Sequence, residues 1–97
     1  MKIALYLRVS TDQQDYDHQE TELTAKALSD GKEISYIFND KISGFKDDKD
    51  RPDLNKMLQL TSNEIQDIYI SELSRLSRNP TYLKILIDRF TEKGINI

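Results

Sequence analysis

Residues 2–10 read Lys2-Ile3-Ala4-Leu5-Tyr6-Leu7-Arg8-Val9-Ser10, and this stretch decides the fold. The residues at positions 3, 5, 7 and 9 are aliphatic, and Ala4 and Tyr6, on the opposite face of an extended chain, are apolar as well. A strand that is apolar on both faces is typical of a parallel sheet covered by helices on both sides. The sequence therefore predicts an α/β domain with its first strand inside the sheet.

The next two elements follow the same alternation of helix and strand. A helix is expected over residues 12–29, because Ser10, Thr11 and Asp12 offer N-caps and Gly31 suits its end. Its predicted core stripe consists of Leu23, Ala27 and Leu28. A second strand is predicted around Ile34, Tyr36 and Phe38, which alternate with smaller or more polar residues.

The middle of the chain predicts a loop, a short helix and a third strand. Residues 39–50 are expected to be a long loop that is most mobile over residues 43–50. Pro52 suits the first position of a helix. The expected core stripe of this helix is Leu54, Met57, Leu58 and Thr61. Residues 68–73 are predicted to be the third strand.

A tandem repeat, Leu73-Ser74-Arg75-Leu76-Ser77-Arg78, comes after this strand. If the repeat forms a helical turn, Arg75 and Arg78 share one side while Leu73 and Leu76 face the core. Asn79 and Pro80 then predict the start of a further helix. Its expected apolar stripe is Leu83, Leu86, Ile87 and Phe90, and its expected end is Gly94. Residues 95–97 are predicted to begin a fourth strand.

Composition limits the possible functions of the chain. Its 97 residues are enough for one domain, and the absence of cysteine excludes disulfides, thiol catalysis and Cys-ligated zinc. His18 is the only histidine and is expected to be inert on a solvent-facing helix. No apolar run approaches the roughly 20 residues of a membrane span, so we expect a cytoplasmic protein. The formal net charge of −3 argues against a generally basic surface, but local basic pockets occur in acidic proteins.

Polar and basic side chains fall where two predicted strands end. Arg8 and Ser10 are two residues apart and share a face, and Arg75 and Arg78 follow the third strand. In parallel α/β sheets, ligands bind beyond the carboxyl ends of the strands. No acid is interleaved among these arginines, and arginine suits phosphate because its planar fork donates two parallel hydrogen bonds. The sequence therefore predicts a phosphate site beside the hydroxyl group of Ser10, although Ser10 alone also fits an ordinary helix N-cap.

These residues belong to a set of motifs that resembles the serine site-specific DNA recombinases of the resolvase/invertase family. The first block is Tyr6-Leu7-Arg8-Val9-Ser10-Thr11 with Gln13, Gln14, Asp17 and Gln19. The later blocks are Asp40-Lys41-Ile42-Ser43-Gly44, then Arg51-Pro52 with Leu54, and finally the Leu-Ser-Arg repeat. The resemblance covers essentially the whole chain in the same order. It implies a resolvase-like three-layer α/β/α domain with a mainly parallel sheet in the strand order 2-1-3-4.

The resemblance also implies a reaction and the residues that carry it. Ser10 corresponds to the nucleophile that forms a 5′-phosphoserine bond with DNA and frees a 3′-hydroxyl. The catalytic arginines implied are Arg8, Arg51, Arg75 and Arg78. The supporting positions implied are Gln14, Gln19, Asp40, Ser43 and Ser74. Many family members carry an acid at the position of Ser74, so any role of that acid would have to be supplied elsewhere. No metal and no cofactor are implied.

The resemblance further implies partners and a longer protein. We expect residues 1–97 to be a catalytic domain that ends after its fourth strand, without the dimerisation helix and the DNA-binding domain of the family. DNA is the expected partner, and the intact protein is expected to assemble into dimers and tetramers. This chain alone is expected to be a monomer or weak dimer and to be inactive as a recombinase. Resolution, inversion and integration all remain open as the role of the intact protein.

The main alternative is a non-catalytic, flavodoxin-like module that binds phosphate or another protein. A response-regulator receiver would be the obvious example, but it needs acids at the end of its first strand. This chain has Arg8 and Ser10 there. A covalent adduct between Ser10 and DNA would separate the recombinase from this alternative.

Overall fold

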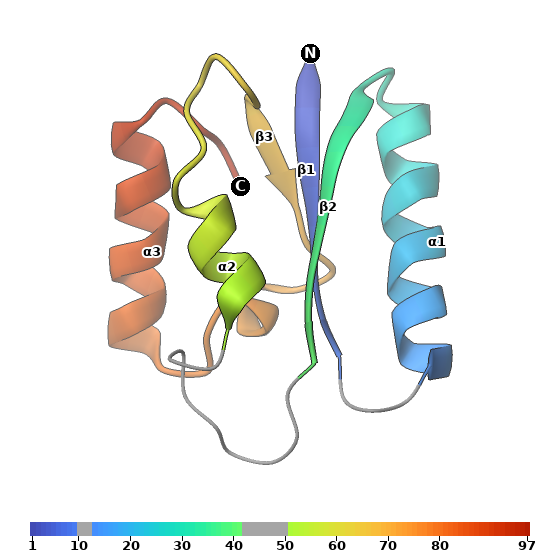
Figure 1. Ribbon diagram of the computed structural model, residues 1–97, viewed down its shortest axis with the longest axis horizontal. Coiled ribbons are helices and arrows are strands. Elements are labelled where there is room, and N and C mark those ends of the chain that lie inside the picture. The colour runs from blue at the N-terminus through green and yellow to red at the C-terminus, as the bar shows by residue number, and fades with distance from the viewer. Residues whose placement is uncertain (10–12, 42–50) are drawn as a thin grey trace.

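The computed structural model describes residues 1–9, 13–41 and 51–97, which form three layers (Figure 1). The strands are β1 (Lys2–Val9), β2 (Glu33–Lys41) and β3 (Asp67–Tyr69). The helices are α1 (Gln13–Ser29), α2 (Pro52–Met57), α3 (Pro80–Glu92) and a 3₁₀ turn, η2 (Leu73–Arg75). In Figure 1, α1 covers one face of the sheet, while α2 and α3 cover the other.

The sheet has the order β2-β1-β3, and both pairings are parallel. This confirms the predicted α/β class and places β1 in the centre. The predicted fourth strand appears among the described residues only as an isolated parallel bridge between Asp67 and Asn96. The amide of Ile68 donates to the carbonyl of Asn96 at 2.8 Å, so the end of the chain lies along the outer edge of β3.

Both faces of β1 are buried, as its sequence pattern predicts. Ile3, Leu5, Leu7 and Val9 pack with Leu23 and Ala27 of α1. Ala4 and Tyr6 face the other side and join a larger cluster. That cluster includes Phe38, Leu54, Met57, Leu58, Leu76, Leu86 and Phe90. The central strand therefore anchors the cores on both sides of the sheet.

Three predicted core residues are exposed. Leu28 is 80% exposed, because α1 packs through Leu23 and Ala27 and the next residue is turned about 100° away from that side. Thr61 is exposed because α2 ends at Met57, four residues earlier. Leu73 is 49% exposed, since it begins the 3₁₀ turn after the sheet has ended, while Leu76 is buried.

Two predicted element boundaries are also wrong. Residues 39–41 belong to β2 rather than to a loop, because β2 stays paired with β1 as far as Val9 and Lys41. The third strand ends at Tyr69 rather than Leu73, because its pairing with β1 stops at Leu5. Residues 10–12 and 42–50 lie outside the described residues, so the expected mobility of residues 43–50 falls outside them too.

Candidate active site

Arg8 lies near the end of β1 and is the centre of a group of arginines. It is largely buried and lies opposite Asp40 in the pairing of β1 with β2. Burial lowers the pKa of Arg8, and the positive charges of Arg51, Arg78 and Arg75 lower it further. These four side chains therefore interact electrostatically at one end of the sheet, where a bound anion would relieve their repulsion.

The backbone carbonyl of Arg8 accepts two hydrogen bonds from distant parts of the chain. Gln19 Nε2 donates to it at 3.1 Å from the buried side of α1. Arg75 Nη1 donates to it at 3.3 Å from the turn that follows β3. Gln19 Nε2 also donates to Asp15 Oδ1 at 3.1 Å. The end of β1, two residues before Ser10 in the sequence, is thus held from both sides.

Arg51 is only 2% exposed and immediately precedes α2. Its Nη1 donates to the carbonyl oxygen of Leu76 and, at 3.5 Å, to that of Arg75. The Arg51 side chain therefore joins the start of α2 to the turn that carries Arg75. Because both of these acceptors are uncharged backbone carbonyls, the two contacts position the guanidinium without neutralising its charge.

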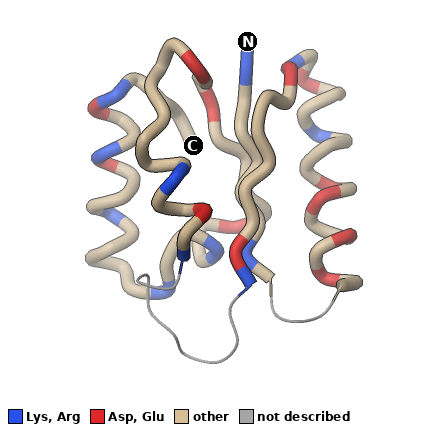
Figure 2. The backbone as a smooth tube through the Cα atoms, in the orientation of Figure 1, with Lys and Arg blue, Asp and Glu red and all other residues tan. Residues whose placement is uncertain are grey.

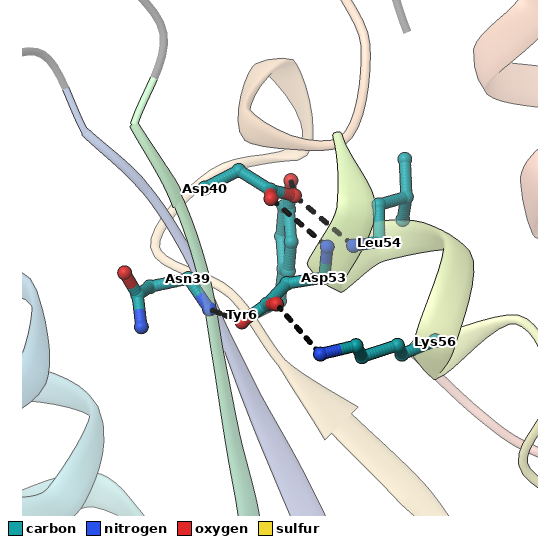
Figure 3. Close-up of polar contacts among 6 residues, drawn as sticks. All are labelled: Tyr6, Asn39, Asp40, Asp53, Leu54 and Lys56. Carbon is teal, nitrogen blue, oxygen red and sulfur yellow. Dashed lines mark hydrogen bonds and ion pairs between the residues drawn. The ribbon is translucent and has the colours of Figure 1, made fainter. Parts of the chain in front are cut away.

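Asp40 holds the start of α2 (Figure 3). Its carboxylate is buried and accepts hydrogen bonds from the amides of Asp53 and Leu54, both at 3.0 Å, and from the Tyr6 hydroxyl at 2.8 Å. The first amides of a helix have no partner within the helix, so a carboxylate from another element serves as their cap. The structure gives Asp40 this structural role beside the arginines.

Glu72 is a neighbour of the site that the sequence analysis did not single out. Its Oε1 lies 3.5 Å from Nη2 of Arg75, three residues later. Ser74 is exposed on η2. The spacing of Glu72 and Arg75 is the only signal in the sequence that could have identified this pair.

The remaining predicted site residues are Arg78, Gln14, Ser10 and Ser43. Arg78 is exposed just before α3 and acts on Arg8 through its charge. Gln14 is exposed in the first turn of α1. Ser10 and Ser43 lie outside the described residues. Lys and Arg gather at the carboxyl ends of β1 and β2 and at the starts of α2 and α3, whereas α1 carries mainly acids along its length (Figure 2).

Neither a metal-binding group nor a membrane-spanning helix occurs in the part of the chain that the structure describes. Within residues 1–9, 13–41 and 51–97, no group of three or more His, Cys, Asp or Glu side chains is placed to hold a metal ion. No helix in the same part of the chain has the length and apolar character needed to cross a bilayer.

The chain matches the model of the resolvase N-terminal domain over residues 3–97, and it therefore belongs to that family. It is similar to the DNA-invertase of Escherichia phage P1, with 38% identity over 92 residues that cover 94% of this chain and 44% of that protein. It is also 36% identical over 98 residues to the transposon Tn3 resolvase of Escherichia coli, covering 100% of this chain and 49% of that protein. The chain thus spans about half the length of these relatives.

Two solved structures share the fold. The N-terminal catalytic domain of TP901-1 integrase superposes with a TM-score of 0.83 at 31% identity, covering 100% of this chain and 75% of that one. The C-terminal catalytic domain of ISC1926 TnpA, an IS607-like serine recombinase, gives a TM-score of 0.86 at 24% identity, covering 100% and 68%. The second likeness supports the fold alone, and the first agrees with the family.

Proposed function

We propose that this chain is the catalytic domain of a serine site-specific DNA recombinase, which cuts and rejoins DNA through a covalent bond between Ser10 and a 5′-phosphate. The observation that carries the proposal is that Arg8, Arg51 and Arg75 lie together at the carboxyl end of β1. In the sequence, β1 ends at the residue before Ser10. The membership of the resolvase N-terminal domain family supports the same assignment.

In the proposed reaction, the oxygen of Ser10 attacks the phosphorus of one DNA phosphodiester. The bond from phosphorus to the 3′-oxygen breaks, and the proton lost by Ser10 is balanced by one gained by the leaving 3′-hydroxyl. Arg8, Arg51, Arg75 and Arg78 stabilise the negative charge on the phosphate oxygens in the transition state. Attack of another strand's 3′-hydroxyl on the phosphoserine reverses the step and joins the new partners.

The supporting residues have more limited proposed roles. Gln19 holds the carbonyl of Arg8, and Asp40 holds the helix that follows Arg51. Gln14, Ser43 and Ser74 are proposed as positions around the same phosphate. We further propose that the intact protein binds DNA as a dimer or tetramer in the cytoplasm.

The test is to trap the complete protein on a suicide DNA substrate that carries its recombination site. Mass spectrometry of the adduct should place the DNA link on Ser10, and Ser10→Ala should bind the DNA while forming no adduct. Thr11→Ala is the matched control and should still form the adduct. A link at Thr11, Ser43 or Ser74, or unchanged cutting by Ser10→Ala, would overturn the assignment.

A further inference from the structure

Glu72 is an acid beside the arginines of the site, and the proposed mechanism gives it no role. Among the ion pairs between residues that the structure describes, one includes an arginine of the site, and it joins Glu72 to Arg75. Oε1 of Glu72 lies 3.5 Å from Nη2 of Arg75. The other guanidiniums near Arg8 repel one another, so a carboxylate beside one of them can decide how that one is oriented.

The guanidinium of Arg75 is held at two of its three nitrogens. Nη1 donates to the carbonyl of Arg8 at 3.3 Å, and Nη2 lies near Glu72. A guanidinium held at one nitrogen can turn about that contact, whereas contacts at two nitrogens fix its plane. The third nitrogen, Nε, is buried and has no hydrogen-bond partner among the described residues. A buried donor without a partner is costly, so an acceptor on a bound ligand would stabilise it.

The backbone of η2 brings Glu72 and Arg75 together. Glu72 precedes η2 with an extended backbone, and its carbonyl accepts the amide of Arg75 at 3.0 Å. In a 3₁₀ turn, side chains three residues apart lie directly above one another. The amide of Leu76 donates to the carbonyl of Leu73 at 3.0 Å, and Leu76 is buried. Because backbone bonds and Leu76 hold this turn, the side chain of Glu72, which is 60% exposed, can be changed without unfolding it.

We propose that Glu72 is a positioning residue for Arg75. Its carboxylate holds Nη2 while the carbonyl of Arg8 holds Nη1, so the guanidinium meets the DNA phosphate in one orientation. The remaining donors of the guanidinium, including Nε, are then left for the phosphate oxygens. The inference rests on the proposed function, because it concerns the orientation of one of the proposed catalytic arginines.

The opposite role for Glu72 is competition with DNA for Arg75. If Glu72 competed, its removal would raise both the affinity for DNA and the rate of adduct formation. If it positions Arg75, its removal should leave the affinity equal or slightly higher, because a negative charge near the DNA is lost, but should lower the rate. The rate and the affinity together therefore distinguish the two roles.

The experiment compares Glu72→Gln with Glu22→Gln in the complete protein. Glutamine keeps the length of the side chain and removes its charge. Glu22 is the matched control, because it lies in the middle of α1, is 57% exposed and is 3.6 Å from His18. Glu72→Gln should form the DNA adduct about 5-fold more slowly, the effect of losing a fully formed exposed ion pair, without losing affinity for DNA. Glu22→Gln should match the wild type in both quantities.

A second comparison shows whether the effect passes through Arg75. In an Arg75→Lys background, Glu72→Gln should slow adduct formation by less than about 2-fold further, because lysine has no planar group for the carboxylate to orient. A third measurement does not depend on DNA. Rotation of the Arg75 guanidinium, followed by NMR of the complete protein, should be faster in Glu72→Gln than in the wild type.

The inference would be overturned by a rate of adduct formation in Glu72→Gln that equals or exceeds the wild-type rate. An equal effect of Glu72→Gln in the wild-type and Arg75→Lys backgrounds, or unchanged rotation of the guanidinium, would also overturn it. If the wild type forms the adduct at Ser10 while Glu72→Gln matches it, only the role of Glu72 is wrong. If the wild type forms no adduct at Ser10, the proposed function fails, and the inference fails with it.

Discussion

Arg75 illustrates how one side chain combines structural and electrostatic roles. It donates to the carbonyl of Arg8, lies 3.5 Å from Glu72 and adds to the positive charge around Arg8. A guanidinium placed in this way suits stabilisation of charge that develops on a phosphate. The same side chain also links the turn after β3 to the end of β1.

Arg75→Ala should therefore lower the rate of DNA adduct formation about 10²–10³-fold, the usual cost of removing such a donor. The affinity of the complete protein for DNA should change far less. Single-turnover adduct formation and filter binding measure the two quantities. Arg89→Ala, an exposed arginine in the last turn of α3, is the control. Equal losses in the two variants would argue against a specific role for Arg75.

The raised pKa of Tyr6 predicts how the free energy of unfolding changes with pH in the alkaline range. Its pKa is raised in the folded protein, first by burial and then by Asp40, so the folded state keeps a proton that the unfolded state loses above about pH 10. The free energy of unfolding should then fall as pH rises above about 10, by at most about 1.4 kcal/mol per pH unit from this group. Urea unfolding at several alkaline pH values should show a shallower decline for Tyr6→Phe, and parallel declines would contradict the assignment.

Among the elements, α3 has the best-defined start. The side chain of Asn79 accepts hydrogen bonds from the amides of Thr81 at 2.9 Å and Tyr82 at 3.1 Å, and Pro80 occupies the first turn. Asn79→Ala should reduce the free energy of unfolding by about 1 kcal/mol, because two amides lose their cap. Urea unfolding measures the loss. Asn79→Asp retains the acceptor and should remain near wild type, and a loss as large as that of Asn79→Ala would argue against the capping role.

Elements that depend on local chemistry were predicted well from the sequence. The two apolar faces of β1, the Pro52 start of α2 and the Asn79-Pro80 start of α3 all have short-range signals. The ends of β2 and β3 were wrong because strand length depends on how far the neighbouring strand pairs, which is a long-range property. The exposure of Leu28 depends in the same way on which side of α1 meets the sheet.

The site was only partly accessible from the sequence. Because parallel strands end at the same edge of a sheet, Arg8 and Arg75 were expected to lie close together. In the structure, the Arg75 side chain donates a hydrogen bond to the carbonyl of Arg8. Arg51 was indicated only by family resemblance. Its side chain, at the start of α2, donates to the carbonyl of Leu76 in the turn after β3, and no local sequence pattern predicts a hydrogen bond over that separation. The contact between Tyr6 and Asp40 has no local signal, because the residues are on different strands.

At the scale of the whole molecule, the charged residues of the described part are unevenly distributed. The formal net charge is −3, yet Lys and Arg gather where β1 and β2 end, and acids predominate along α1 (Figure 2). A compact group of positive charges raises the local concentration of anions even in an acidic protein. This distribution favours an anion site at one end of the sheet rather than on the acidic α1.

Inorganic phosphate should therefore raise the thermal midpoint of this chain more than chloride does at equal ionic strength. Binding to the folded state alone stabilises it by RT ln(1 + [L]/Kd), about 2.7 kcal/mol at 100 times Kd. Differential scanning fluorimetry measures the shift, and Arg75→Ala should reduce it strongly. Equal shifts with both salts, or an undiminished shift in Arg75→Ala, would argue against a preformed anion site.

The carbonyl of Arg8 accepts two side-chain hydrogen bonds, and this affects which substitutions the domain tolerates. Because Gln19 and Arg75 both donate to the carbonyl of Arg8, substituting either one alters the restraint on the same atom. Laboratory evolution that randomises positions 19 and 75 together should recover linked pairs of residues, while a library at either position alone yields few active clones. The effect of a substitution at position 19 in α1 would then depend on the residue at position 75 in η2, because both side chains donate to the carbonyl oxygen of Arg8.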